Sequence, residues 1–170
     1  MKVYHDPAKE KTMSEQIFTR DYQPDDVQAL ANIYFNTIHR VNIAHYTQEQ
    51  VDAWAPQLSL ETEGWAKKFS RTKPIVAVVG DAVVGFAEFE LNGHIDCFYI
   101  HHDWIRKGVG TVLINEVFSR AKRQNTSRIF VEVSITAKPF FERQGFITLT
   151  EQTVLIRGVE LINYKMEKKI

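Results

Sequence analysis

Residues 94–111 read HIDCFYIHHDWIRKGVGT, and this stretch decides how the chain is expected to fold. Its first part, His94–His101, is a run of mostly apolar and aromatic residues typical of a strand. After a polar turn, apolar residues repeat at three- and four-residue steps, which predicts a helix over Gly108–Arg123. A second strand is expected at Ile129–Val133. The two strands should therefore be parallel and joined by a right-handed crossover.

Upstream of this unit, the sequence predicts one strand, three helices and two further strands. The expected segments are strand 17–22, helices 24–38, 47–54 and 61–69, and strands 75–79 and 83–90. Thr47 and Gln50 form a capping-box pattern at the start of the second helix, and Pro56 is expected to end it. Gly80-Asp81 is typical of a tight turn between two strands.

Downstream, a short helix is expected over residues 136–144, followed by a hairpin of strands 154–156 and 159–166. Pro139 lacks an N–H group, which a helix tolerates only in its first turn, so this helix cannot start much before Ile135. That start is expected to leave the Ser134 side chain free to face a ligand. The order of elements predicts an α/β (α+β mixed) fold, in which helices cover a mixed sheet.

Composition limits the classes of function. The 170 residues carry 21 Lys+Arg and 21 Asp+Glu, and no run of like charges marks a nucleic-acid-binding surface. No apolar run approaches the roughly 18 residues of a membrane span, and no apolar stretch after Lys2 suggests a secretory signal. A single cysteine cannot close an internal disulfide. We expect a cytoplasmic chain with no nucleic-acid or membrane partner, a polar tail at 1–15 and a single domain at 16–170.

The glycine turn before the second helix is the most informative chemical feature. Free N–H groups and the positive end of the helix dipole would face whatever precedes Gly108, and they favour a pyrophosphate. Arg106 and Lys107 would add positive charge. A dinucleotide fingerprint fails because Leu113 replaces its third glycine, and a P-loop fails because Phe86 replaces its lysine. Glycine at a helix opening is also common as a purely structural turn.

Two separate motifs resemble those of the GNAT superfamily of acyl-CoA-dependent N-acetyltransferases, over residues 16–168. Ile105–Gly110 is similar to that family's Arg/Gln-x-x-Gly-x-Gly/Ala acetyl-CoA loop, and Ala137–Phe146 is similar to its Ala-x-x-Phe-Tyr-x-x-x-Gly-Phe signature. The segment Tyr46–Pro56, with its Trp-Ala-Pro, further resembles a branch of small bacterial members. The resemblance implies a mostly antiparallel mixed sheet of about seven strands, flanked by four to five helices, around a central parallel strand-helix-strand unit.

The resemblance also implies acetyl-CoA as cosubstrate and a set of residues that bind it. Backbone groups around Ile100 and His102 would pair with the pantetheine arm, Ser134 would lie near that arm, and Phe141 would pack beside the sulfur. The loop that takes the pyrophosphate would comprise Arg106, Lys107, Gly108, Val109, Gly110 and Thr111.

Two positions depart from the family pattern. Ile105 stands where the loop usually carries Arg or Gln, which removes one phosphate contact, although Arg106 is adjacent. Phe141 stands where many members carry a tyrosine that protonates the leaving thiolate, and phenylalanine has no proton to give. These departures leave open an alternative reading, a non-catalytic acyl-CoA sensor or interaction module with the same fold.

Direct acetyl transfer needs a base, because an ammonium group is not nucleophilic. Period-two alternation would place His94, Asp96, Phe98 and Ile100 on one face of their strand. His94 also falls where some family members place a catalytic glutamate, and its ordinary pKa of about 6.5 suits a base. His94 and Asp96 are therefore the candidate catalytic residues, with Glu88 as a second base candidate. Each could instead be an ordinary solvated or satisfied polar side chain.

Other polar residues give weaker indications. His101 and His102 should point to opposite faces of a strand and so could not chelate a metal together, and no metal is expected. Cys97 is expected to be a small buried hydrophobe. By the resemblance, His39, His45, Tyr46 and Trp54 lie in the region that shapes the acceptor pocket in relatives, although Trp54 is expected to be a core residue rather than a substrate contact. We expect an N-acetyltransferase for an amine on a small molecule or peptide, and a homodimer remains open because splayed strands expose an edge.

Overall fold

The computed structural model describes residues 16–170, and the expected tail at 1–15 lies outside the described residues. One mixed sheet of seven strands, in the order β1-β2-β3-β4-β5-β7-β6, forms the centre of the molecule. Its strands are β1 (Ile17–Asp21), β2 (Ile75–Val79), β3 (Ala82–Phe89), β4 (His94–Ile100), β5 (Arg128–Ser134), β6 (Ile147–Ile156) and β7 (Val159–Lys169). The α-helices are α1 (Val27–Arg40), α2 (Gln48–Trp54), α3 (Thr62–Thr72), α4 (Val109–Arg123) and α5 (Lys138–Arg143).

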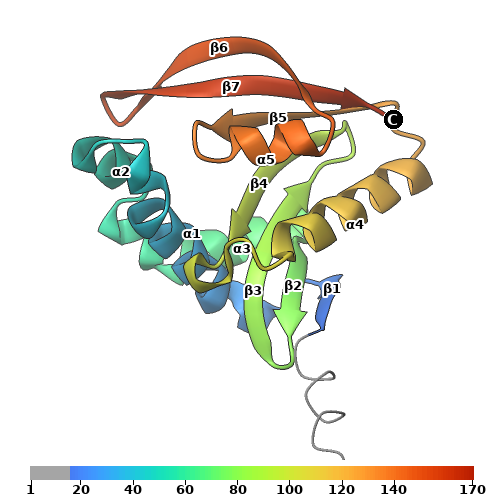
Figure 1. Ribbon diagram of the computed structural model, residues 1–170. Helices are drawn as coiled ribbons and strands as arrows, with labels where there is room; N and C mark the ends of the chain where they lie inside the picture. Colours follow the sequence, from blue (N-terminus) through green and yellow to red (C-terminus); the bar gives the residue numbers. More distant parts are fainter. Residues whose placement is uncertain (1–15) are drawn as a thin grey trace, which may run out of the picture.

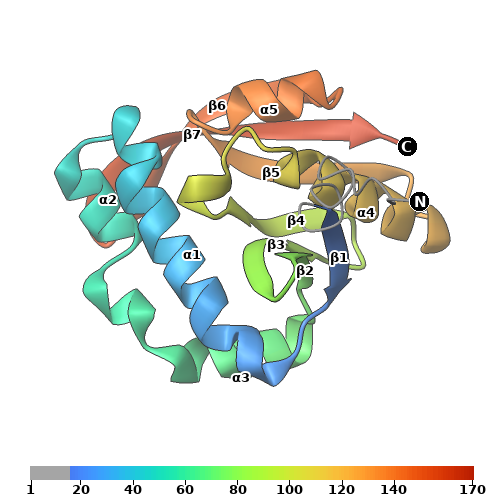
Figure 2. The ribbon, with the colours of Figure 1, turned by 60° about the horizontal axis from the view of Figure 1, so that its bottom comes forward.

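The helices cover the two faces of the sheet as separate layers (Figures 1 and 2). Helices α4 and α5 pack on one face, where Leu113 and Phe141 belong to the same buried cluster. Helices α1, α2 and α3 pack on the other, where Leu30 and Phe69 meet Phe86 of β3. Each helix buries one apolar stripe against the sheet, as its three- and four-residue spacing predicts.

The predicted crossover is confirmed. Strands β4 and β5 are parallel, and α4 connects them, whereas every other neighbouring pair in the sheet is antiparallel. Local signals in the sequence also hold: Thr47 and Gln50 form the capping box of α2, and Pro139 lies in the first turn of α5. The mixed sheet with helices on both faces is the fold that the sequence predicts.

Several boundaries differ from the prediction. β4 ends at Ile100 rather than His101, α3 continues to Thr72, and β6 begins at Ile147 instead of Val154. The added part of β6 is an edge segment on which Ile147 is 60% exposed, so its pairing with β7 and not core burial holds it in place. Such a segment lacks the one-sided burial from which strands are predicted.

Among residues 16–170, no helix combines the length and the apolar character that crossing a membrane requires.

Candidate active site

The cleft begins where β4 and β5 separate. Their parallel ladder includes only His94 with Phe130 and Ile95 with Val131, and beyond Ile95 the strands diverge. The amide of His101 donates to Val84 on β3, so by alternation the backbone groups of Ile100 and Phe98 point away from β3 and into the gap. A cleft of about 760 Å³ occupies this opening. It offers backbone donors and acceptors to an extended ligand.

Residues from both layers line the cleft, and its two sides differ. The α1–α2 side is formed by Thr37, Val41, Asn42, Ala44, His45 and Trp54, together with Asp96, Tyr99, Glu132, Ser134 and Thr136 of the sheet and the loop after β5. The α4–α5 side is formed by Phe98, Ile100, Trp104, Ile105, Arg106, Gly108, Gly110, Thr111, Ala137, Pro139, Phe140, Phe141, Arg143 and Gln144.

The loop before α4 has the geometry of an anion site. Arg106 and Gly108 both adopt positive φ, of 61° and 90°, and α4 begins at Val109. The amide of Val112 is the first to bond within the helix, to Gly108, so the preceding amides of the first turn face outward. A helix opening of this kind attracts phosphate groups. The loop therefore fits the diphosphate of a CoA molecule.

Gly110 is required for a reason that the sequence argument missed. A Cβ at this position would lie 2.9 Å from Cε2 of Phe140. The glycine thus lets α5 pack closely against the opening of α4, in addition to leaving its amide accessible. The two family-like motifs are in direct contact at this point.

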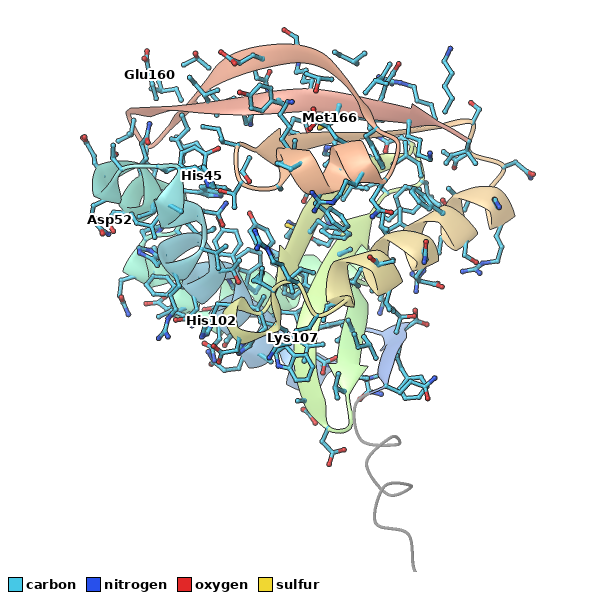
Figure 3. All side chains as sticks on the ribbon, viewed as in Figure 1. His45, Asp52, His102, Lys107, Glu160 and Met166 are labelled. Atoms are coloured by element: carbon cyan, nitrogen blue, oxygen red, sulfur yellow. The ribbon has the colours of Figure 1, made fainter. Side chains whose placement is uncertain are left out.

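Seven of the ten predicted cofactor residues line the cleft, and His102, Lys107 and Val109 do not. Val109 is buried in the core, and the Lys107 ammonium lies over the Trp104 ring, 5.2 Å from its centroid. His102 and Lys107 are both on the segment between β4 and α4 (Figure 3). Their backbone groups belong to the loop that borders the cleft.

Ser134 faces the cleft as expected, but its hydroxyl oxygen also has partners within the protein. Its hydroxyl oxygen accepts a hydrogen bond from the Ala137 amide at 3.0 Å and lies 3.2 Å from Nδ2 of Asn42, which also donates to it. Ser134 thus caps the turn that leads into α5 and joins it to the segment after α1. Its own proton remains able to donate into the cleft.

Phe141 is buried at the bottom of the α4–α5 side. Its ring makes edge-to-face contacts with Phe98 at 5.3 Å and with Phe146 at 5.1 Å between centroids. Because only 1% of the residue is exposed, it forms an apolar wall of the cleft. Because residue 141 is phenylalanine, no side-chain hydroxyl is present at this position.

The predicted alternation along β4 is wrong, because a β-bulge interrupts it. Cys97 pairs with Glu88 and Ile95 pairs with Phe89, so Asp96 is the extra residue. Ile95 and Phe98 consequently belong to the core beneath α4, while Asp96 turns toward α3 and bonds Lys68 at 2.8 Å. The bulge thereby places the Asp96 carboxylate on the α1–α2 side of the cleft.

His94 is held between two carboxylates. Its Nε2 lies 2.6 Å from Glu132 of β5, its Nδ1 lies 2.9 Å from Glu90, and its ring stacks on Phe130. Burial lowers the pKa of His94, but the hydrogen bonds that its ring donates to Glu132 and Glu90 outweigh this effect and leave the pKa above its ordinary value. Both ring nitrogens can donate only when the ring is protonated, so this arrangement favours the imidazolium form.

Glu132 is the functional candidate that the sequence reasoning missed. It lines the cleft, whereas His94 does not, and it makes the direct contact with His94. A signal was present: a lone glutamate in the apolar run of β5, two residues after the position that pairs with His94. Asp96, the other predicted catalytic residue, has Lys68 and not His94 as its hydrogen-bond partner.

The second base candidate, Glu88, does not line the main cleft and lies behind Asp96. Only 1% of it is exposed, its carboxylate lies 2.7 Å from Lys68 Nζ, and Thr72 donates to it. Cys97 lies in the same cluster, and burial raises the pKa of its thiol well above the ordinary value. The thiol is therefore protonated near neutral pH, as expected of a buried structural cysteine.

The four residues expected near the acceptor pocket divide into two pairs. His45 and Trp54 line the cleft. His39 bonds the Ala55 carbonyl, and the Tyr46 hydroxyl donates to the Ile162 carbonyl while accepting from the amide of residue 135. His39 and Tyr46 therefore hold the α1–α2 region together and onto the sheet.

The geometric argument about His101 and His102 is wrong. Both follow the end of β4, their rings stack with centroids 4.3 Å apart, and one ligand atom from each lies within 4.8 Å of an Asp103 carboxylate oxygen. The end of the strand removes the alternation on which the expectation rested. The expectation that the protein binds no metal had no other support, and it stays a prediction.

Known proteins show the same architecture. The family model for the acetyltransferase (GNAT) domain matches residues 42–168. An N-acetyltransferase of Escherichia coli strain K12 described as uncharacterized, YafP, is 33% identical over 150 residues, which cover 88% of this chain and 94% of the relative.

Two crystal structures extend the comparison. A GCN5-related N-acetyltransferase from Rhodopseudomonas palustris superposes with a TM-score of 0.84 at 30% identity, covering 90% of this chain and 95% of the other. The PaiA N-acetyltransferase from Thermoplasma acidophilum, in complex with coenzyme A, gives a TM-score of 0.69 at 16% identity, covering 91% and 99%. At 16% identity, the second similarity shows a shared fold alone.

Proposed function

Because the chain belongs to the GNAT acetyltransferase family, and is therefore an acetyl-CoA-dependent acyltransferase, we propose that it transfers the acetyl group directly to an amine of a small molecule or peptide. One observation carries the proposal: a single cleft connects the opening of α4, through the β4–β5 gap, with carboxylates on the opposite face of the sheet. A cosubstrate and an acceptor can thus meet from opposite sides of the sheet.

On the α4–α5 side, this chain supplies binding and orientation. The first-turn amides of α4 and the Arg106 side chain hold the diphosphate, and the backbone groups of Phe98 and Ile100 align the pantetheine arm. The Ile100 amide faces the gap and donates to the thioester oxygen as charge develops on it. The Thr37 hydroxyl donates a hydrogen bond of 2.7 Å to the Ile100 carbonyl and so fixes this part of the backbone.

On the α1–α2 side, Glu132 and His94 remove the proton. The ammonium proton of the acceptor passes, through water, to Glu132 and the deprotonated form of His94, and from there toward Glu90 and solvent. The neutral amine then forms the C–N bond as the C–S bond breaks. Asp96 keeps a negative charge close to the approaching cation.

The leaving thiolate takes its proton from water in this proposal. Phe141 has no proton to donate, and a thiol pKa of about 8.5 makes thiolate a tolerable leaving group without a dedicated acid. Phe141 instead keeps the sulfur end of the cleft apolar.

Turnover tests the proposal. The purified protein with acetyl-CoA and a panel of alkylamines, polyamines, aminoglycosides and peptide N-termini should release CoA with at least one acceptor well above the rate without acceptor. Saturable acetyl-CoA binding with CoA release at background across the panel would contradict the proposal and favour the non-catalytic acyl-CoA sensor.

We further propose that residues 16–170 act as one domain and form a homodimer through β6. This edge strand exposes Leu155 at 70% and Leu149 at 49%, and its outer backbone groups are available to pair with a second strand. Light scattering after size-exclusion chromatography should give twice the chain mass of 19.7 kDa, and Leu155→Glu should reduce it to the monomer. A monomer at about 100 μM wild-type protein would contradict the dimer.

A further inference from the structure

We infer that the acceptor is a cationic primary amine that carries no carboxylate, with an apolar body; this inference rests on the proposed function and names its substrate class. The α1–α2 side of the cleft, defined above, holds the observations. It is the side from which an acceptor can approach the gap while the cosubstrate occupies the α4–α5 side.

The acidic groups of this side gather at the gap between the strands. Asp96 and Glu132, on neighbouring strands, both line the cleft, and each is about 39% exposed in its side chain. Behind them lie Glu88, which shares Lys68 with Asp96, and Glu90, which shares His94 with Glu132. Lys68 and His94 are thus each shared between a carboxylate that lines the cleft and a second one behind it, and neither of these two cations lines the cleft itself.

No lysine or arginine among the described residues lines the α1–α2 side. The two arginines of the cleft, Arg106 and Arg143, are on the α4–α5 side, on the phosphate loop and on α5. Among the described residues that line the α1–α2 side, the one basic side chain is His45, whose Nδ1 lies 3.0 Å from the Thr136 hydroxyl. Sites that recognise a carboxylate usually present an arginine fork, and this side has none.

The remaining walls of this side are apolar or aromatic. Val41 and Ala44 come from the segment after α1, Trp54 ends α2, and Tyr99 projects from β4. Aromatic faces of this kind pack against alkyl or aryl groups and attract cations. The side therefore complements an ammonium group at the strand gap, joined to an apolar body that lies against Trp54 and Tyr99.

Matched acceptors that differ at one group test the inference. Phenethylamine, phenylalanine and phenylalaninamide form one set, and cadaverine, lysine and lysinamide form another. We expect kcat/KM for each amine to exceed that of its carboxylated partner by at least about tenfold, since a carboxylate would lie close to Asp96 and Glu132. The amides keep the added bulk but not the charge, so they should recover most of the loss.

Binding of the same compounds to the protein saturated with CoA, measured by calorimetry, separates this inference from the proposed function. Preferential binding of the amines without turnover would support the substrate class and contradict the acetylation proposal. Turnover of phenylalanine or lysine as fast as their decarboxylated partners would overturn the substrate class and leave the proposed function intact. Absence of binding and turnover for every compound in both sets would also overturn the substrate class.

Variants assign the preference to the two carboxylates. Asp96→Asn and Glu132→Gln should each raise KM for the amines about 10-fold and shrink the amine-to-amino-acid ratio, while KM for acetyl-CoA stays unchanged. Glu160→Gln is the control, because Glu160 is exposed on the β6–β7 hairpin outside the cleft (Figure 3). If both cleft variants fold with wild-type melting temperatures and retain the wild-type amine-to-amino-acid ratio, the assignment is wrong.

Discussion

At the scale of single residues, His94 combines a structural and a chemical role. Its ring joins the start of β4 to Glu132 of β5 at the point where the two strands still pair. The protonated ring donates to Glu132 and Glu90 together, so the charged form of His94 contributes to stability, whereas the neutral form takes part in the proposed proton path. The two roles have different pH dependences and can be separated.

The contribution of His94 to the stability of the fold changes with pH in a defined direction. Because the pKa of His94 is raised in the folded protein, its contribution is fully present below the unfolded pKa of about 6.5 and is lost as pH rises through the folded value. His94→Gln should therefore lower the free energy of unfolding by about 1 kcal/mol at pH 5.5 and by less at pH 8.5. Urea denaturation at both pH values measures this, and a larger loss at pH 8.5 would contradict the ion-pair assignment.

The chemical role is tested by kinetics. His94→Ala and Glu132→Gln should each lower kcat by roughly 100- to 10,000-fold and displace the acidic limb of the pH–rate profile, with KM for acetyl-CoA unchanged. The double variant should lose little more than either single variant, because the pair acts as a unit. A His94→Ala profile that coincides with wild type would remove His94 from the mechanism.

At the scale of elements, the contact between α4 and α5 joins the two family motifs. Gly110 on α4 is close enough to Phe140 on α5 that even a methyl group must displace the ring. The position of Phe141 against the cleft thus depends on the same contact that exposes the α4 amides. We expect the two helices to respond together to substitutions at Gly110.

Substitution of Gly110 should reduce acetyl-CoA binding in proportion to size. Gly110→Ala should weaken it several-fold by moving Phe140, and Gly110→Trp should abolish saturable binding by filling the helix opening. Gly64→Ala on α3 is the control, because its Cβ would have no neighbour within 4 Å; it should bind normally and gain about 0.5–1 kcal/mol in stability. Normal affinity in Gly110→Trp would refute the loop assignment.

Elements defined by local signals were predictable from the sequence. The capping box at Thr47 and the proline in α5 act within one helical turn, so their consequences follow from a few adjacent residues. The bulge at Asp96 was not predictable in this way, because one extra residue on β4 is defined only by its pairing with β3. The bulge decides which side of the cleft receives the Asp96 carboxylate, and so the candidate site was only partly anticipated.

The partners in the ion pairs could not be predicted from local signals in the sequence, for a similar reason. Lys68 and Asp96 meet because α3 packs on the sheet, and Glu132 meets His94 because two parallel strands align in one register. Both contacts join residues about 30 to 40 positions apart. Whether the Trp54–Pro56 segment marks a bacterial subgroup stays a prediction.

At the scale of the whole molecule, function follows from a sheet that opens between two helical layers. One side of the cleft presents helix amides and an arginine-bearing loop, and the other presents carboxylates of the sheet and aromatic side chains. An anionic cosubstrate and a cationic acceptor are thereby drawn to opposite sides of the same gap. The near-zero net charge of the chain hides this internal separation.

A crystal structure of the protein with acetyl-CoA tests the central claim most directly. The account predicts the diphosphate against the amides between Gly108 and Thr111, the pantetheine arm along Phe98 and Ile100, and the acetyl carbon facing Glu132. A cosubstrate bound outside the β4–β5 gap, or an acetyl group directed away from the Asp96 and Glu132 carboxylates, would contradict it.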